Sequence, residues 1–225
     1  GTINSQVSVN NTLGFSIVKY TGNNTAGATV GHKMDAVPEL IIWKVITSVS
    51  GWKVYCNQFT SPTTQIMELQ DTGGVSTNTV FINGTAPSTS LITLGAYGDT
   101  NGSGQDIVTY CFTSISGYSK VGNYSGNQSL NVANQINFGF TPGFVLIKNT
   151  TTGSTSWVMA DDRRGYNDLY ANDGSAEFAS GSLYGAHFLS NGFTTNTADV
   201  SRNQSGDTYI YLAIAEQVYN ANAVT

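Results

Sequence analysis

The sequence predicts an all-β protein built from two tandem, similar antiparallel β-sandwiches of a jelly-roll-like type. Three observations carry this prediction: an unusual composition, short runs of alternating polar and apolar residues, and a set of landmarks that occurs twice. Charged residues make up 10% of the 225 residues, against about 25% in ordinary soluble proteins. Gly, Ser, Thr and Asn are abundant and the residues that fill helix surfaces are scarce, which favours strands joined by tight turns.

The landmarks recur at an offset of about 104 residues, which is the size of a self-sufficient domain and not of a solenoid or propeller unit. The matched segments are 20–23 and 124–127, 38–44 and 142–148, and 107–114 and 209–216, with Trp52 matched by Trp157. Matches in this order indicate a tandem duplication. The predicted organisation is a linker or first strand at 1–13, one sandwich at 14–116, a second at 117–219, and a tail at 220–225.

The first repeat shows the strand patterns clearly. Period-two alternation predicts half-buried strands at residues 15–20 and 52–56. Residues 40–43 are continuously apolar, so this strand should be covered on both faces. Pro38 and its counterpart Pro142 are expected at the first residue of a strand, where no N–H is needed. Further short strands are predicted at 65–69, 80–82, 91–94 and 107–114, and the second repeat should follow the same plan.

Charge and hydropathy exclude two classes of partner. The net charge is −5, and no basic cluster is longer than Arg163-Arg164. A nucleic-acid partner requires a basic face that neutralises phosphates, so we expect none. No apolar run approaches the ~20 residues of a membrane span, so we expect no membrane insertion.

The two cysteines, Cys56 and Cys111, both lie in strand-like runs of the first repeat. Two buried free thiols that behave as small apolar side chains are the favoured interpretation. A disulfide stays open as the alternative, provided that the two strands are neighbours.

Catalytic and metal-binding patterns are weak. Neither histidine, His32 or His187, stands beside a nucleophile motif. The carboxylates of residues 161–177 are better explained as a charged surface loop, because adjacent residues of a strand face opposite sides. Residues 99–106 resemble the start of a calcium loop, but Tyr110 stands where the twelfth, acidic ligand belongs. We therefore expect no enzyme, no metal and no cofactor.

Exposed aromatic residues are the remaining clue to binding. Sugar-binding surfaces stack a Trp or Tyr ring on a sugar face and add polar hydrogen bonds. The loop-rich middle of the second repeat offers such a set, and partial burial or subunit packing is the alternative for its tyrosines. Trp52 and Trp157, in contrast, occupy matched positions and are expected in the core. The candidate ligand-binding residues are Tyr166, Asn167, Asp168, Tyr170, Asn172 and Tyr184.

Four segments, some of them parts of the repeat, carry a family resemblance: residues 117–127, 142–148, 188–193 and 206–216. Together they resemble a repeated domain of unknown function from tail and fibre proteins of marine tailed phages, such as cyanophages and pelagiphages. The resemblance covers residues 14–217 and brings no established catalytic residues. Residues 161–178 depart from the pattern.

The resemblance implies a phage virion structural protein, a tail-fibre or tailspike-type appendage module on the virion surface, outside the cell. Its expected partners are other virion proteins, further copies of itself (a trimer is compatible with the resemblance), and a host-surface glycan or receptor. Two alternatives stay open: a head-decoration (cement) protein of the capsid, and a secreted carbohydrate-binding module.

Overall fold

A computed structural model describes residues 1–129, 134–164, 167–177, 185–195 and 199–216. The described chain is nearly all β, with antiparallel strand pairing in every sheet and one short helix, α1 (Gly98–Asn101). The predicted all-β sandwich class is therefore confirmed. The described part of the chain contains no helix with the length and hydropathy that a membrane span requires.

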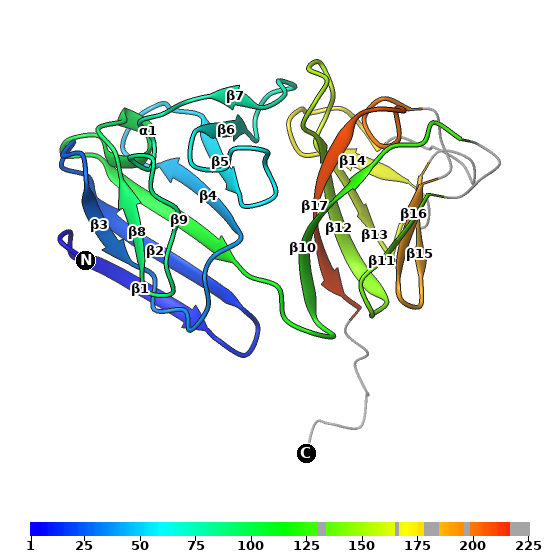
Figure 1. The fold of residues 1–225 in the computed structure, drawn as a ribbon, viewed down its shortest axis with the longest axis horizontal. Helices are drawn as coiled ribbons and strands as arrows, with labels where there is room; N and C mark the ends of the chain where they lie inside the picture. Colours follow the sequence, from blue (N-terminus) through cyan, green and yellow to red (C-terminus); the bar gives the residue numbers. More distant parts are fainter. Residues whose placement is uncertain (130–133, 165–166, 178–184, 196–198, 217–225) are drawn as a thin grey trace.

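The first half contains a seven-stranded sheet in the order β1-β2-β9-β4-β5-β6-β7, with the two-stranded sheet β3-β8 against it (Figure 1). The strands of this half are β1 (Ser5–Asn10), β2 (Phe15–Thr21), β3 (Ala28–Gly31), β4 (Leu40–Val45), β5 (Trp52–Cys56), β6 (Gln65–Glu68), β7 (Ser76–Thr77), β8 (Leu91–Leu94) and β9 (Asp106–Phe112). The predicted linker or first strand, residues 1–13, contains β1, which pairs with β2.

The second half contains a five-stranded sheet in the order β10-β17-β12-β13-β14, with the three-stranded sheet β11-β16-β15 against it. Its strands are β10 (Ser119–Ser125), β11 (Asn134–Asn137), β12 (Pro142–Asn149), β13 (Val158–Asp161), β14 (Asp168–Tyr170), β15 (Ala186–Leu189), β16 (Gly192–Thr195) and β17 (Thr208–Ala215). The order of the five-stranded sheet repeats the order β2-β9-β4-β5-β6 of the first half, so the matched sequence segments occupy matched places.

The repeated Tyr-Thr/Ser-Gly-Asn motif joins the end of one strand to the loop before the last strand of its half. In the first half the Tyr20 hydroxyl donates to the Thr100 carbonyl, at 2.5 Å, and the Asn23 N–H donates to Asn101 Oδ1, at 2.9 Å. In the second half Tyr124 donates to the Arg202 carbonyl, at 2.7 Å, and Asn127 N–H donates to Asn203 Oδ1, at 2.9 Å. The motif is therefore a hydrogen-bonded clasp, present twice.

The glycine of this motif is required by close backbone packing. A Cβ on Gly22 would collide with the carbonyl oxygen of Gly102, and one on Gly126 with the carbonyl oxygen of Gln204. Neither glycine has a positive φ. The constraint is therefore space, and any side chain would push the two segments apart.

The matched lysine and tryptophan of each repeat also form one local structure. Lys44 Nζ donates to the Ser50 carbonyl and lies 5.7 Å from the Trp52 ring centroid. Lys148 Nζ donates to the Thr155 carbonyl and lies 5.9 Å from the Trp157 ring centroid. Each lysine thus ties a strand to the loop that follows it and lies against a ring.

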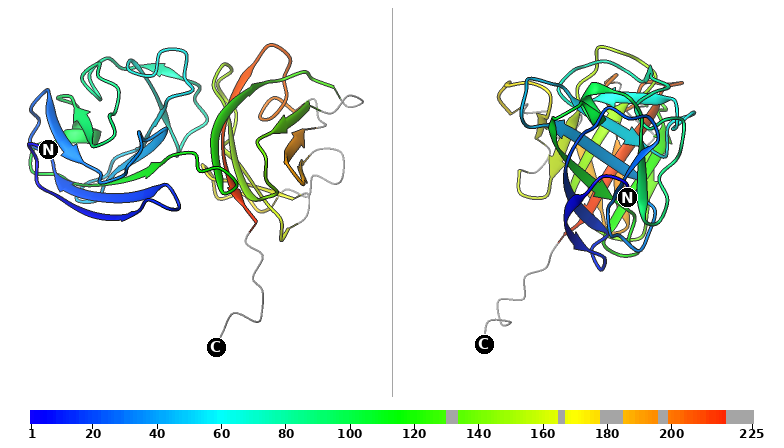
Figure 2. Two further views of the ribbon diagram at one scale, coloured as in Figure 1. Left: turned by 60° about the horizontal axis from the view of Figure 1, so that its bottom comes forward. Right: turned by 90° about the vertical axis from the view of Figure 1, so that its left-hand side faces the viewer.

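Each half has its own apolar cluster, and a third cluster joins residues of both halves. Figures 1 and 2 show the two halves side by side. β4 shows how one strand serves two clusters: Ile41 and Trp43 face the core of the first half, whereas Leu40 and Ile42 face the second half. The prediction that this strand is covered on both faces is therefore confirmed. The central cluster consists of Leu40, Ile42, Val54, Cys56, Phe59, Met67, Val121, Leu146, Trp157, Ile210 and Leu212.

Three local predictions need correction. The segment 80–82 is a turn and not a strand, although Phe81 and Ile82 are fully buried, because the chain reverses at Asn83 with a φ of 52°. Pro38 lies before β4, whereas Pro142 does begin β12. The turn predicted at 99–106 begins with helix α1.

The cysteines are free and buried. β4 lies between their strands, β5 and β9, and Cys111 faces the core of the first half while Cys56 faces the central cluster. A disulfide between them is therefore excluded. Burial raises the pKa of Cys56 to about 12, as expected of an inert core thiol.

Candidate functional site

Asp168, one of the predicted ligand-binding residues, lies in the interior. Its carboxylate pairs with the guanidinium of Arg202, and both side chains are 0% exposed. Burial raises the pKa of Asp168, against the opposing effect of Arg202. Because the carboxylate is fully buried and paired with Arg202, this side chain does not reach a surface on which a ligand could lie.

The other candidates that the structure describes each contact neighbouring groups of the protein. Asn172 Oδ1 accepts a hydrogen bond from the backbone N–H of Trp157, at 2.7 Å, and so supports the chain before β13. Asn167 Nδ2 donates to Glu177 Oε1, at 2.5 Å. Tyr170 is half-buried against the core of the second half. Tyr166 and Tyr184 lie outside the described residues.

The calcium-like segment directs its two aspartates to different partners. Asp99 accepts a hydrogen bond from Ser50 Oγ, at 2.6 Å, and pairs with Lys53, at 3.2 Å. Asp106 pairs with Lys19 on the other side of the sheet. No group of three or more His, Cys, Asp or Glu side chains converges among the residues that the structure describes.

His32 is a structural residue. It is fully buried, its Nδ1 accepts from the Met34 N–H at 3.2 Å, and its Nε2 lies 3.1 Å from the Ser88 carbonyl. Burial lowers its pKa, so the neutral ring is favoured. His187 lies half-buried in β15.

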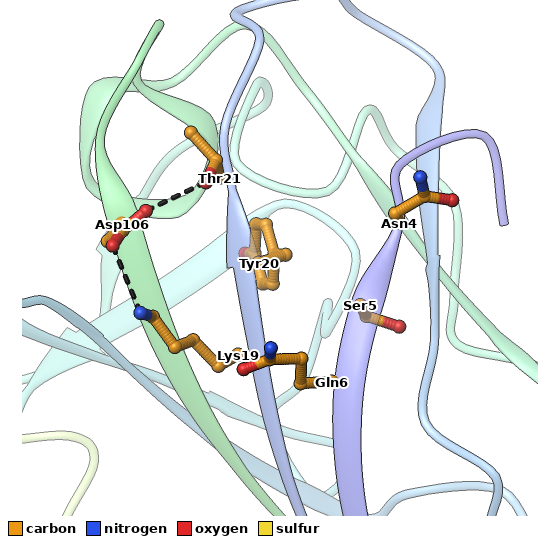
Figure 3. Close-up of a pocket in the computed structure, with 7 residues that line it drawn as sticks. All are labelled: Asn4, Ser5, Gln6, Lys19, Tyr20, Thr21 and Asp106. Atoms are coloured by element: carbon orange, nitrogen blue, oxygen red, sulfur yellow. Dashed lines mark hydrogen bonds and ion pairs between the residues drawn. The ribbon is translucent and has the colours of Figure 1, made fainter.

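A polar pocket of about 310 Å³ lies at the end of β1, β2 and β9 (Figure 3). Lys19 Nζ lies 3.1 Å from Asp106 Oδ2, and Thr21 Oγ1 donates to Asp106 Oδ1 at 2.7 Å. These hydrogen bonds, from Thr21 first and then from Lys19, lower the pKa of Asp106, so the carboxylate is ionised at neutral pH. The lining residues are Asn4, Ser5, Gln6, Lys19, Tyr20, Thr21 and Asp106.

The pocket faces the same side of the sheet as two aromatic rings. Strand register aligns Lys19 with Val108, Val108 with Lys44, and Lys44 with Trp52. Residues opposite each other in an antiparallel sheet share a face. The half-buried Trp52 ring stacks on Tyr110, with centroids 6.3 Å apart and an interplanar angle of 24°.

This face has the chemistry of a site for a polar, hydroxyl-rich ligand. The pocket offers amide donors and acceptors, a hydroxyl, an ammonium and a carboxylate. The half-buried rings farther along the same face, with Lys44 Nζ 5.7 Å from the Trp52 centroid, add apolar surface. From Lys19 to Trp52 the distance is three strand spacings, or about 14 Å. A ligand that touches both must therefore be longer than a single sugar ring.

Sequence reasoning missed this site because its residues come from segments far apart in the chain. Trp157 is in the core as predicted, at 2% exposed. Trp52, expected to share that environment, is only half-buried at the edge of the central cluster. One signal was available in the sequence. Lys19 in β2 and Asp106 in β9 occupy outward-facing positions of their strands, and their opposite charges could have suggested that the two strands are adjacent.

Comparison with known proteins identifies a family. Neither the curated proteins nor the solved structures give a match to this chain. A family model described as "Domain of unknown function (DUF7483)" matches residues 1–218. Because the match spans almost the whole sequence, the chain belongs to the family of proteins that contain the DUF7483 domain of unknown function.

Proposed function

We propose that the chain is a non-catalytic module of a phage virion appendage, of the tail-fibre or tailspike kind, that binds a host-surface glycan. On this proposal it lies on the virion surface, and its other partners are virion proteins. The proposal is supported by the resemblance of the four sequence segments described above. The non-catalytic part of the proposal is also supported by how the fold uses its charges. The charged groups of Lys53, Lys148 and Arg202 each have partners inside the protein, as structural side chains do.

The observation that carries glycan binding is the polar pocket on the same face of the sheet as the Trp52 and Tyr110 rings. Sugars present hydroxyl groups at their edges and C–H groups on their faces, so they need both polar partners and a flat apolar surface. The outer face of β2, β9, β4 and β5 supplies both along one row of residues. The second half covers only part of that outer face: Trp52 and Tyr110 pack against the central cluster and stay half-buried, whereas Lys19 and Val108 do not belong to it.

A glycan array probed with the full chain tests this proposal. Asp106→Asn keeps the shape of the pocket and removes its negative charge, and we expect about tenfold weaker binding. Trp52→Ala removes the ring surface and should weaken binding to oligosaccharides more than binding to single sugars.

Asn167→Ala is the matched control, because Asn167 belongs to the patch predicted in the second half. Binding that depends on Asp106 and Trp52 but not on Asn167 supports the proposed site. Loss of binding in Asn167→Ala alone would move the site to the second half. Absence of binding to every glycan would overturn the glycan proposal, and binding to purified capsids in its place would favour the head-decoration alternative.

A further inference from the structure

β1 is an edge strand whose outward backbone groups are open from Ser5 onward, whereas the Ile3 N–H just before it donates to the Thr29 carbonyl of β3. It pairs with β2 only, with Gln6 opposite Lys19, Ser8 opposite Ile17 and Asn10 opposite Phe15. In an antiparallel sheet the backbone groups of alternate residues point to opposite neighbours. The direction of these groups in β1 therefore follows from the pairing of β2.

β2 bonds to β9 through its even-numbered residues, as shown at both ends by Gly22 N–H to the Gln105 carbonyl and Thr113 N–H to the Gly14 carbonyl. Its odd-numbered residues therefore bond to Gln6, Ser8 and Asn10 of β1. It follows that the N–H and C=O groups of the remaining β1 residues point away from the sheet. These residues are Ser5, Val7 and Val9.

The other edges of the two large sheets are blunted. β7 has two residues and β14 has three. β10 is longer, but the N–H and C=O of Ser119 bond to Ile115, and the Val121 N–H donates to Ser114 Oγ. In the parts of the chain that the structure describes, no group pairs with the outward backbone groups of β1.

The side chains of β1 add no protection. Its sequence, SQVSVN, has no charge and no proline, and its pairing with β2 is continuous, without a bulge. A charged residue, a proline or a bulge would hinder edge-to-edge pairing, and β1 has none of the three. Val9 is 37% exposed, so the strand also leaves apolar surface uncovered near its C-terminal end.

We propose that β1 pairs with β1 of a second copy of this chain, antiparallel, about a two-fold axis through Val7. In this register Val7 lies opposite Val7 of the second copy, and Ser5 lies opposite Val9. All outward N–H and C=O groups of both strands are then paired, because only odd-numbered residues carry them. No like charges meet, since the strand is uncharged. The two seven-stranded sheets become one continuous sheet.

This contact closes at two copies, because a two-fold interface uses the same surface on both. Light scattering on the full chain should therefore give twice the 23.8 kDa mass of one chain at high concentration. A mass of three chains would overturn the proposal, and so would a single-chain mass at the highest soluble concentration.

A pair of variants at Val9 tests the edge. Val9→Pro removes an outward N–H, which an edge strand tolerates, and should weaken dimerisation about tenfold or more, because the two-fold repeats the loss. Val9→Thr keeps both the N–H and the β-branched shape and should dimerise as the wild type does. A dimer that persists unchanged in Val9→Pro, with a wild-type circular dichroism spectrum, would contradict pairing through β1.

A cysteine pair tests the register independently. Gln6 of one copy lies opposite Ser8 of the other in a non-hydrogen-bonded pair, with Cα atoms about 4.5 Å apart, which a disulfide can bridge. Gln6→Cys combined with Ser8→Cys should oxidise to a covalent dimer. Ser8→Cys alone places the two thiols on the diagonal and should cross-link at least about tenfold more slowly. The buried Cys56 and Cys111 do not interfere, and equal rates in the two variants would rule out this register.

Discussion

Lys148 shows how a chain with few charges uses one that it buries. The side chain is 0% exposed, and its ammonium donates to the carbonyls of Thr155 in its own half and of Thr72 in the first half, the latter at 3.1 Å. Burial lowers its pKa from 10.5 to about 8, although Asp71 acts in the opposite direction. The lysine therefore links the two halves and makes the link sensitive to alkaline pH.

The pH dependence of this link can be predicted with its sign. Between pH 8 and 10.5 the unfolded chain binds a proton at Lys148 more readily than the folded chain does. The wild type should therefore gain stability relative to Lys148→Met as pH rises through this range, by on the order of 1–3 kcal/mol. Urea unfolding of both proteins from pH 7.5 to 10 measures it. Tyrosine titration is common to both proteins, so a pH-independent difference would contradict the prediction.

Among the elements, the paired clasps explain why the sequence repeats where it does. Tyr20 and Tyr124 reach matched backbone carbonyls, and the glycines two residues later let two backbones touch. These contacts join segments about 80 residues apart in each half. A motif with the sequence of a simple turn is therefore a long-range contact.

Replacing the clasp glycines should separate these backbones. We expect Gly22→Ala and Gly126→Ala each to lower the free energy of unfolding by about 1–3 kcal/mol, because the added methyl group meets backbone that cannot move aside. Gly98→Ala is the control: no atom lies within 4 Å of its Cβ position, and the residue begins helix α1. Thermal unfolding compares the three variants, and equal losses in all of them would refute the steric explanation.

Local pattern predicted some elements well and failed at others for identifiable reasons. Alternation located β2 and β5, and continuous apolarity located β4 with both faces covered, but β5 is buried on both faces and not half-buried as its alternation predicted. It misassigned 80–82, because burial of Phe81 and Ile82 in a turn gives the same apolar run as a strand. Local pattern could not predict the polar pocket. β1 and β9 contribute to it from opposite ends of the first half, and only the strand order brings them together.

In the whole molecule, the central cluster couples two sandwiches that each have a core. Trp157 is its largest fully buried side chain, and its Nε1 donates to the Glu68 carbonyl of the other half, at 2.9 Å. Because this contact is apolar and hydrogen-bonded, we expect the wild type to unfold in one cooperative transition.

Removing Trp157 should uncouple the halves. Trp157→Ala is expected to cost about 3–5 kcal/mol and to split the calorimetric transition into two. Trp52→Ala, at the half-buried matched position, should cost less and keep a single transition. A single transition in both variants would show that the cluster does not set the cooperativity of the molecule.

The apolar outer faces that meet at the central cluster also determine how the two halves stay together. Both partners in that contact are the large sheets of copied units, and they use equivalent strands, β4 and β12 among them. Either half alone would expose this apolar face to water. Covalent linkage in one chain holds the two faces together at a high effective concentration, so their contact does not depend on the concentration of the protein.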